Sequence, residues 1–102
     1  MKEIEKSSRS ESTYYVLLTP DGYFKDAFED LFLEDDECNY TFTDSIEGAY
    51  RFEKLDGKYD APKYLWNDTK SIENITEALE YLGGEIHSVT EIIETKTKYL
   101  IV

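Results

Sequence analysis

The side chains with the most potential for chemistry lie in residues 26–50, which carry nine carboxylates and no lysine or arginine. This block supplies most of the formal net charge of −12, which arises from 23 acids and 11 bases. Self-repulsion on this scale disfavours a compact fold, and a small core needs no such field for packing. The block is therefore either a solvated acidic face or loop, or a surface that occupies a protein groove built for a polyanion.

A mimic of a polyanion must hold its carboxylates on a rigid frame, because duplex DNA carries one charge per roughly 1.7 Å of axis. Alternate residues on one strand face lie about 6.6 Å apart, and helix neighbours at i and i+4 about 6 Å apart. Both interpretations of the block stay open, and tyrosines would add contact area if it binds a partner. The candidate partner-binding residues are Asp26, Glu29, Asp30, Glu34, Asp35, Asp36, Glu37, Tyr40, Asp44, Glu47 and Tyr50.

Signals of an enzyme are nearly absent from the sequence. A nucleophilic dyad would need Cys38 and His87, the only cysteine and histidine, and the four acids before Cys38 disfavour a thiolate. Residues 34–37 offer hard oxygen ligands but lack the alternating ligands and the glycine of an EF-hand loop. Gly83-Gly84 follows an expected helix, whereas phosphate loops place glycines before one. We therefore predict no enzyme activity, no catalytic residue, no cofactor and no dedicated metal site.

The first half of the chain predicts strands separated by turns. Residues 13–19 form a β-branched and aromatic run that ends in Pro20-Asp21-Gly22, and residues 23–25 begin a return strand. Residues 26–33 are ambiguous, although their apolar spacing favours a short helix over a strand. We expect a loop at the acidic residues 34–37. A further strand is expected over residues 39–43.

The second half predicts two helices and two strands. Asp44 has the spacing of an acidic N-cap for a short helix that reaches about Phe52. The clearest helix covers residues 71–82, capped by Ser71 and stopped by Gly83-Gly84. Irregular structure is expected at 55–68, and two strands at 85–94 and 98–102.

These elements together predict an α+β fold, a small antiparallel sheet with two or three helices packed on one face. The polar residues 1–12 are expected to be flexible, and residues 13–102 to form a single domain. Nine tyrosines fit either a small aromatic core or a protein interface. The acidic balance repels nucleic acid and anionic lipid, and no apolar stretch is long enough to span a bilayer. We therefore expect neither nucleic acid nor a membrane as a direct partner.

Three segments carry a resemblance to a known class of protein: YYVLL at 14–18, TFTDSIEGAYRF at 41–52 and ITEALEYLGGEI at 75–86. Together with the size and acidity, they resemble small acidic accessory proteins of bacteriophages, of the anti-defence or anti-CRISPR-like kind. The resemblance implies a non-enzymatic inhibitor in the cytoplasm of a bacterial host. Its partner would be a protein with a basic nucleic-acid-binding groove, a CRISPR nuclease first and a DNA-repair or restriction enzyme next. Anti-CRISPR proteins share no common motif, so no residue role follows from the resemblance.

A second hypothesis needs no mimicry. The chain could be a phage or host interaction module whose acidic surface serves only solubility. Its functional surface would then be apolar, around Tyr59, Tyr64, Leu65 and Trp66.

Overall fold

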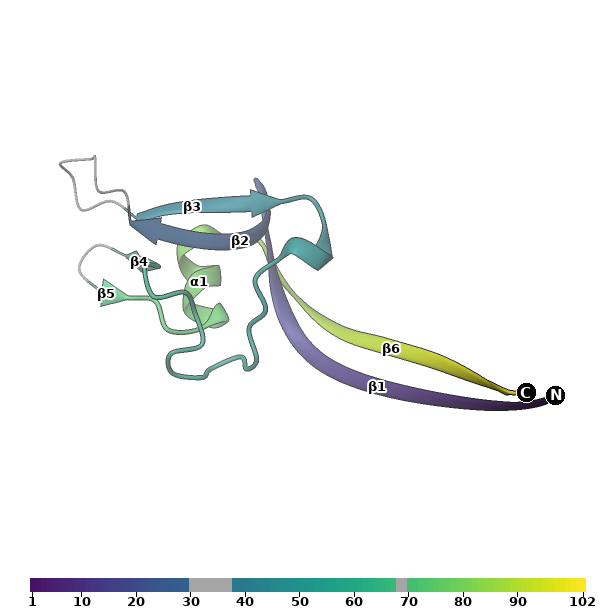
Figure 1. Cartoon of the computed structure of the whole chain (residues 1–102). Coiled ribbons are helices and arrows are strands. Elements are labelled where there is room, and N and C mark those ends of the chain that lie inside the picture. The colour runs from purple at the N-terminus through teal and green to yellow at the C-terminus, as the bar shows by residue number, and fades with distance from the viewer. Residues whose placement is uncertain (30–37, 68–69) are drawn as a thin grey trace.

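The computed structural model describes residues 1–29, 38–67 and 70–102. Figure 1 shows a mainly β protein from which a long two-stranded ribbon projects. The main sheet contains four antiparallel strands in the order β3-β2-β1-β6, and a second sheet joins β4 to β5. The strands are β1 (Lys2–Thr19), β2 (Gly22–Glu29), β3 (Cys38–Thr43), β4 (Trp66–Asn67), β5 (Lys70–Ser71) and β6 (Glu85–Ile101). The helical elements of the described residues are one α-helix, α1 (Ile75–Leu82), and one 3₁₀ turn, η1 (Ile46–Gly48).

The predicted α+β fold, with two or three helices packed on one face of the sheet, is wrong. Residues 26–29 belong to β2 rather than to a helix, because they pair with β3 in an antiparallel ladder that runs to Glu29↔Cys38. A register shift between Phe24 and Asp26 interrupts the strict alternation of apolar residues along this strand.

The predicted helix from Asp44 to about Phe52 is also wrong. Ser45, not Asp44, is the N-cap, and the turn stops at Gly48 because Ala49 is extended, with φ −69° and ψ 148°. Beyond it the chain bonds to the sheet instead of to itself. The Tyr50 N–H donates to the Phe24 carbonyl at 2.9 Å, and Tyr15 and Phe52 exchange two backbone hydrogen bonds of 2.8 and 2.9 Å.

The helix predicted over residues 71–82 forms, but it starts later. Asn74 caps α1 by accepting the Glu77 N–H at 2.9 Å, whereas Ser71 lies in β5. The helix ends at Leu82, followed by Gly83 with φ +76°, as the glycine pair predicted. The turn after residues 13–19 and the strand at 39–43 are likewise confirmed.

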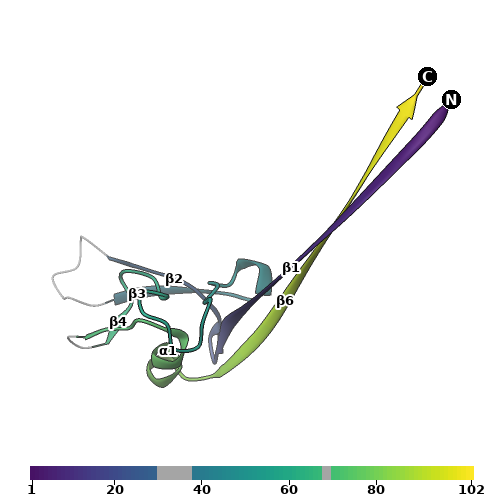
Figure 2. The same ribbon diagram turned by 90° about the horizontal axis from the view of Figure 1, so that it is seen from below.

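The longest element was the least expected. Instead of two strands joined at 95–97, β6 is continuous, and residues 2–12, for which flexibility was predicted, extend β1. The two strands pair without interruption from Lys2↔Ile101 to Leu18↔Glu85. The first and last residues lie side by side at the far tip of this ribbon, as Figures 1 and 2 show.

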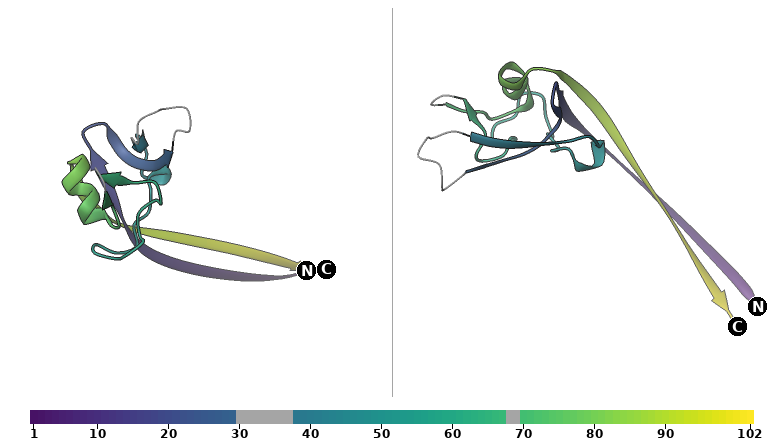
Figure 3. Two further views of the ribbon diagram at one scale, coloured as in Figure 1. Left: turned by 90° about the vertical axis from the view of Figure 1, so that its left-hand side faces the viewer. Right: turned by 90° about the horizontal axis from the view of Figure 1, so that it is seen from above.

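We call residues 2–13 and 90–101 the arm, and residues 14–89 the body. The principal extents of the molecule are 69 × 29 × 24 Å, and the radius of gyration is 19.3 Å. A compact chain of 102 residues has a radius of gyration of about 13 Å. The difference reflects the arm, which Figure 3 shows leading away from the remaining elements.

The core lies entirely in the body and has two parts, one on each face of β1. On one face, Leu17 and Phe24 pack with Phe52, Leu65 and α1. On the other, Tyr14 and Val16 pack with Ala49, next to the half-buried Val89. Each fully buried apolar side chain contributes about 1.5–3 kcal/mol relative to exposure, so the body holds the fold together. The body is therefore the rigid support on which its surface acids are held.

Candidate functional site

The structure describes the side chains of five of the eleven candidate binding residues. Glu29 ends β2. The remaining five candidates lie outside the described residues, and these are Asp30, Glu34, Asp35, Asp36 and Glu37. The five with described side chains are Asp26, Tyr40, Asp44, Glu47 and Tyr50.

The structure brings Asp26 and Tyr50 together. Tyr50 lies alongside β2, and burial raises the pKa of its hydroxyl, as do the nearby carboxylates of Asp60, Asp26 and Glu53. Asp60 is held in place because its two carboxylate oxygens accept the Glu53 and Lys54 N–H groups, each at 3.0 Å. Three acids from separate parts of the sequence thus surround one tyrosine.

Glu53 and Asp60 were missed by the sequence reasoning. They lie outside the dense acidic block, and only the folding of residues 53–60 into a loop brings them to Tyr50. A possible signal was Asp56-Gly57 shortly before Asp60, which is typical of a turn whose aspartate caps backbone N–H groups. The Asp60 and Ala61 N–H groups donate to the Glu73 carbonyl at 2.9 and 3.1 Å, and this long-range contact could not be read from local spacing.

The two candidate tyrosines are both held by other aromatic rings. Tyr50 lies 4.8 Å from Phe52 and 6.0 Å from Phe24 between ring centroids. Tyr40 contacts Phe42 and Tyr81, with centroid distances of 5.7 and 6.3 Å. Both are half-buried, so they stiffen the body and present only part of each ring to a partner.

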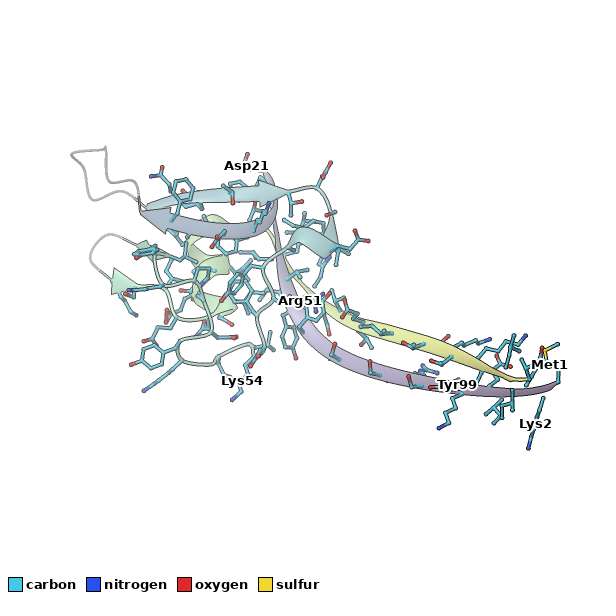
Figure 4. The ribbon with its side chains drawn as sticks, viewed as in Figure 1. Met1, Lys2, Asp21, Arg51, Lys54 and Tyr99 are labelled. Carbon is cyan, nitrogen blue, oxygen red and sulfur yellow. The ribbon has the colours of Figure 1, made fainter. Side chains whose placement is uncertain are left out.

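Asp44 and Glu47 lie away from Asp26. Both are exposed, Asp44 directly after β3 and Glu47 within η1. Since Thr43 pairs with Tyr23, Asp44 lies near the β1–β2 turn, where Figure 4 shows Asp21. Glu29 ends β2 at the opposite end of the β2–β3 pair, about 20 Å away at 3.3 Å per residue. The described candidates therefore do not gather at one point. Asp26 and Tyr40 lie on the β2–β3 pair, whereas Asp44 and Glu47 lie beyond the end of β3.

The charge of the protein is divided sharply between its two regions. The body carries 18 acids and 6 bases, which is the whole net charge of −12, whereas the arm carries five of each. Among the described residues, ion pairs join Arg9 to Glu11, Glu3 to Lys98, Glu85 to His87, and Arg51 to Glu91. None of these pairs joins a lysine of the body to one of its acids, so the body's charge is not cancelled locally.

Arg51 marks the junction between body and arm. Its guanidinium bonds both carboxylate oxygens of Glu91, at 2.7 and 3.3 Å, and lies 4.3 Å from the centroid of the Tyr14 ring. The hydrogen bond to Glu91 raises the pKa of Arg51. This base is therefore engaged with the arm, and it does little to offset the acids on the β2–β3 hairpin.

The register of the sheet separates Cys38 from His87. His87 contacts the Tyr23 ring at 6.1 Å between centroids, and Cys38 pairs with Glu29, six residues further along β2. About 20 Å of strand separates the two positions. His87 instead lies 3.2 Å from the Glu85 carboxylate.

A ligand pocket, a metal site and a membrane span are the other features to consider within the described ranges. A shallow hollow of about 330 Å³ is lined by Tyr59, Ala61, Pro62, Lys63, Ser71, Ile72 and Glu73. In residues 1–29, 38–67 and 70–102, no three His, Cys, Asp or Glu side chains gather so that they could hold a metal ion. The helix described there is too short and too polar to cross a membrane. Of the apolar surface considered above, Leu65 is fully buried, while Tyr59 is 89% exposed.

No protein-family model, no curated protein and no solved structure matches this chain.

Proposed function

We propose that this protein is a non-enzymatic inhibitor, of phage origin, that binds a host effector through the acidic body and blocks its nucleic-acid groove. The partner class that fits best is a CRISPR nuclease, followed by a DNA-repair or restriction enzyme. The observation that carries the proposal is the charge division, which leaves −12 on the body and zero on the arm. A uniform need for solubility would not concentrate the charge in this way.

The body also has the rigidity that a polyanion mimic needs. Asp26 lies in β2 opposite Thr41 of β3, and its Oδ1 accepts the Ala27 N–H at 2.8 Å. Asp60 is fixed by two backbone donors, and Tyr50 by two rings. Fixed carboxylates lose little conformational entropy when they meet lysine and arginine side chains. Complementary charge also accelerates association, most strongly at low ionic strength.

The test compares two variants that each remove four negative charges. The first, in the acidic block, is Glu34→Gln, Asp35→Asn, Asp36→Asn and Glu37→Gln. The matched control, in the arm, is Glu3→Gln, Glu5→Gln, Glu11→Gln and Glu94→Gln.

Binding and inhibition are measured against purified guide-loaded CRISPR nucleases, with a restriction enzyme and a DNA-repair nuclease alongside. The block variant should weaken binding at least about 10-fold, since each lost charge contact contributes up to about 1 kcal/mol. The arm control should bind like the wild type. Equal affinity of the block variant and the wild type, or no binding to any of these enzymes at low salt, would refute the proposal.

The interaction module without mimicry remains a second candidate, because Tyr59 is 89% exposed beside the hollow and has φ +59°. A strained, exposed tyrosine is unusual unless it contacts something. Under this alternative, Tyr59→Ser would abolish partner binding, and the block variant would retain it. Under the proposal above, the two variants would show the reverse.

A further inference from the structure

The arm has two faces of different chemistry. Residues directly opposite each other in the β1–β6 ladder share a face, so the register assigns every arm side chain to one of the two. We call the face that bears Arg9 the charged face. Its charged members are Glu3, Glu5, Arg9, Glu11, Glu94, Lys96 and Lys98, with Ile92 and Leu100 among them. Two ion pairs lie on it, Arg9–Glu11 at 2.6 Å and Glu3–Lys98 at 3.2 Å.

The opposite face, which we call the apolar face, carries few charges. Ile4 lies directly across from Tyr99, and Ile93 and Ile101 project on the same side. Ile93, Tyr99 and Ile101 are 50–53% exposed, and Ile4 is 36% exposed. Five further members of this face have small hydroxyl side chains, and these are Ser8, Ser10, Ser12, Thr95 and Thr97. The remaining members are Lys2 and Lys6 toward the tip and Glu91 at the base.

The apolar face continues a surface that is covered in the body. Further along the same side of the ladder lie Tyr14, Val16 and Val89, against which Ala49 packs. Past Tyr14, every residue of β1 toward the tip is exposed. A two-stranded ribbon is at best marginally stable in water without a third strand or a packed face. The chain accordingly has 7758 Å² of accessible surface, against about 5,900 Å² for a compact monomer of this mass.

We propose that a second copy of this chain covers the apolar face, so that two arms pack face to face and antiparallel in a symmetric dimer. The charge of the arm argues for this occupant. The arm is neutral, so it offers no attraction to the basic groove proposed as the target of the body, and none to nucleic acid. Two neutral arms can approach each other without repulsion.

Charge also selects the antiparallel orientation. A parallel pair would place two bodies of charge −12 side by side, whereas an antiparallel pair separates them by the length of the arms. It also places Lys2 of each tip over the base of the other arm, where Glu91 lies. A two-fold axis between the Lys6↔Thr97 and Ser8↔Thr95 pairs does this, and it sets Ile4 and Tyr99 over the Ser10↔Ile93 pair of the second copy.

The size of the face predicts a weak dimer. Twelve residues of strand are about 40 Å long, and two strands about 10 Å wide, which is roughly 400 Å² on each copy. The pair would bury about 800 Å², below the roughly 1,200 Å² at which stable specific interfaces begin. We therefore expect association that depends on concentration rather than a permanent dimer.

Sedimentation equilibrium of the full chain over a wide concentration series tests this proposal. The mass should rise from 11.9 kDa toward twice that value. Ile93→Ser with Tyr99→Ser, on the apolar face, should keep the protein monomeric. The matched control, Ile92→Ser with Leu100→Ser on the charged face, should associate like the wild type. Both pairs lie outside the core, and circular dichroism checks that the fold is kept. A wild type that stays monomeric, or equal loss of association in both variants, would overturn the proposal.

Crosslinking tests the axis. In a Cys38→Ser background, Ser8→Cys and Ser7→Cys place a thiol on the apolar and charged faces respectively. Packed sheets lie about 10 Å apart, too far for a direct disulfide, so a short bismaleimide is the appropriate reagent. The Ser8→Cys protein should form covalent dimers faster than the Ser7→Cys protein. Equal rates would contradict face-to-face packing. Neither outcome bears on whether the body inhibits a nuclease, so the two proposals can fail separately.

Discussion

In this protein β1 and β6 pass through two contrasting environments. In the body, both faces of β1 are covered, by Phe24, Phe52 and α1 on one side and by Ala49 on the other. In the arm, the same two strands keep their pairing, but their side chains are exposed on both faces. Backbone pairing is therefore enough to continue the two strands into the arm. Only the buried side chains of the body add stability from tertiary packing.

Charge follows the same division. The body combines the core with all of the net negative charge, and the arm combines exposed apolar residues with none. A core can tolerate the self-repulsion of a −12 surface, while an arm without a core could not. The contrast suggests two binding surfaces with different partners, one electrostatic and one apolar.

The largest difference between the regions should appear in stability. Phe52→Ala removes a fully buried ring from the body and should lower the free energy of unfolding by about 3–5 kcal/mol. Leu100→Ala, at a 55% exposed position of the arm, should change it by less than about 0.5 kcal/mol. Urea unfolding at a low protein concentration measures both. Similar losses in the two variants would mean that body and arm unfold as one unit.

A smaller effect is expected at the start of β6. A Cβ on Gly84 would lie 1.9 Å from the Leu18 carbonyl oxygen, and its φ is +110°. Gly84→Ala should therefore destabilise the protein by at least about 2 kcal/mol, because the pairing of β1 with β6 must shift. Gly83→Ala is the control, since Gly83 also has positive φ but has space for a Cβ. Thermal unfolding should give a lower Tm for Gly84→Ala than for Gly83→Ala. Equal Tm values would show that backbone strain at positive φ, rather than the close approach to Leu18, causes the loss of stability.

Hydrogen exchange should separate the regions without any substitution. The Phe52 N–H, bonded to Tyr15 at 2.9 Å inside the body, should exchange at least about 10-fold more slowly than hydrogen-bonded amides of the arm. Raising the protein concentration should slow the arm amides and leave the Phe52 amide unchanged, if the arms associate. Uniform protection along β1 would contradict the contrast between body and arm.

The smallest expected effect concerns Tyr50 at alkaline pH. Burial and the carboxylates of Asp60, Asp26 and Glu53 raise its pKa in the folded state above the ordinary tyrosine value of 10.0. The unfolded chain therefore loses this proton first, so the stability that Tyr50 contributes is present below about pH 10 and is lost as pH rises through the folded pKa. Tyr50→Phe should flatten the fall in stability above pH 10, as followed by unfolding at several pH values. An unchanged slope would mean that Tyr50 is not shielded as the structure indicates.

The local elements of the body were readable from sequence, and the long-range ones were not. Turn residues 20–22 and the strand at 39–43 were correct because their signals are local. Residues 26–29 of the helix expected at 26–33 form a strand because β3 pairs with them, and the helix expected after Asp44 is cut short because Tyr50 and Phe52 bond to β2 and β1. In both cases tertiary hydrogen bonds overrode a marginal local preference.

The arm illustrates the same limit more strongly. Residues 2–12 are polar and serine-rich, and nothing nearby in sequence marks them as a strand; their partner lies some 90 residues away in β6. At the candidate site, sequence reasoning found Asp26 and Tyr50 but not Asp60, whose position depends on the folding of residues 53–60 and on the backbone bond from Asp60 to Glu73. The acids at 30 and 34–37 lie outside the described residues, so their placement stays a prediction.

The most direct test of the central claim is the salt dependence of binding between this protein and a guide-loaded CRISPR nuclease, the proposed class of partner. If the acidic body occupies a groove built for phosphates, the dissociation constant should rise steeply from 50 to 500 mM salt, roughly linearly on logarithmic axes, and the arm control variant should show the same slope. An affinity that stays flat across this range would contradict the account, because it would show that the charge of the body takes no part in binding.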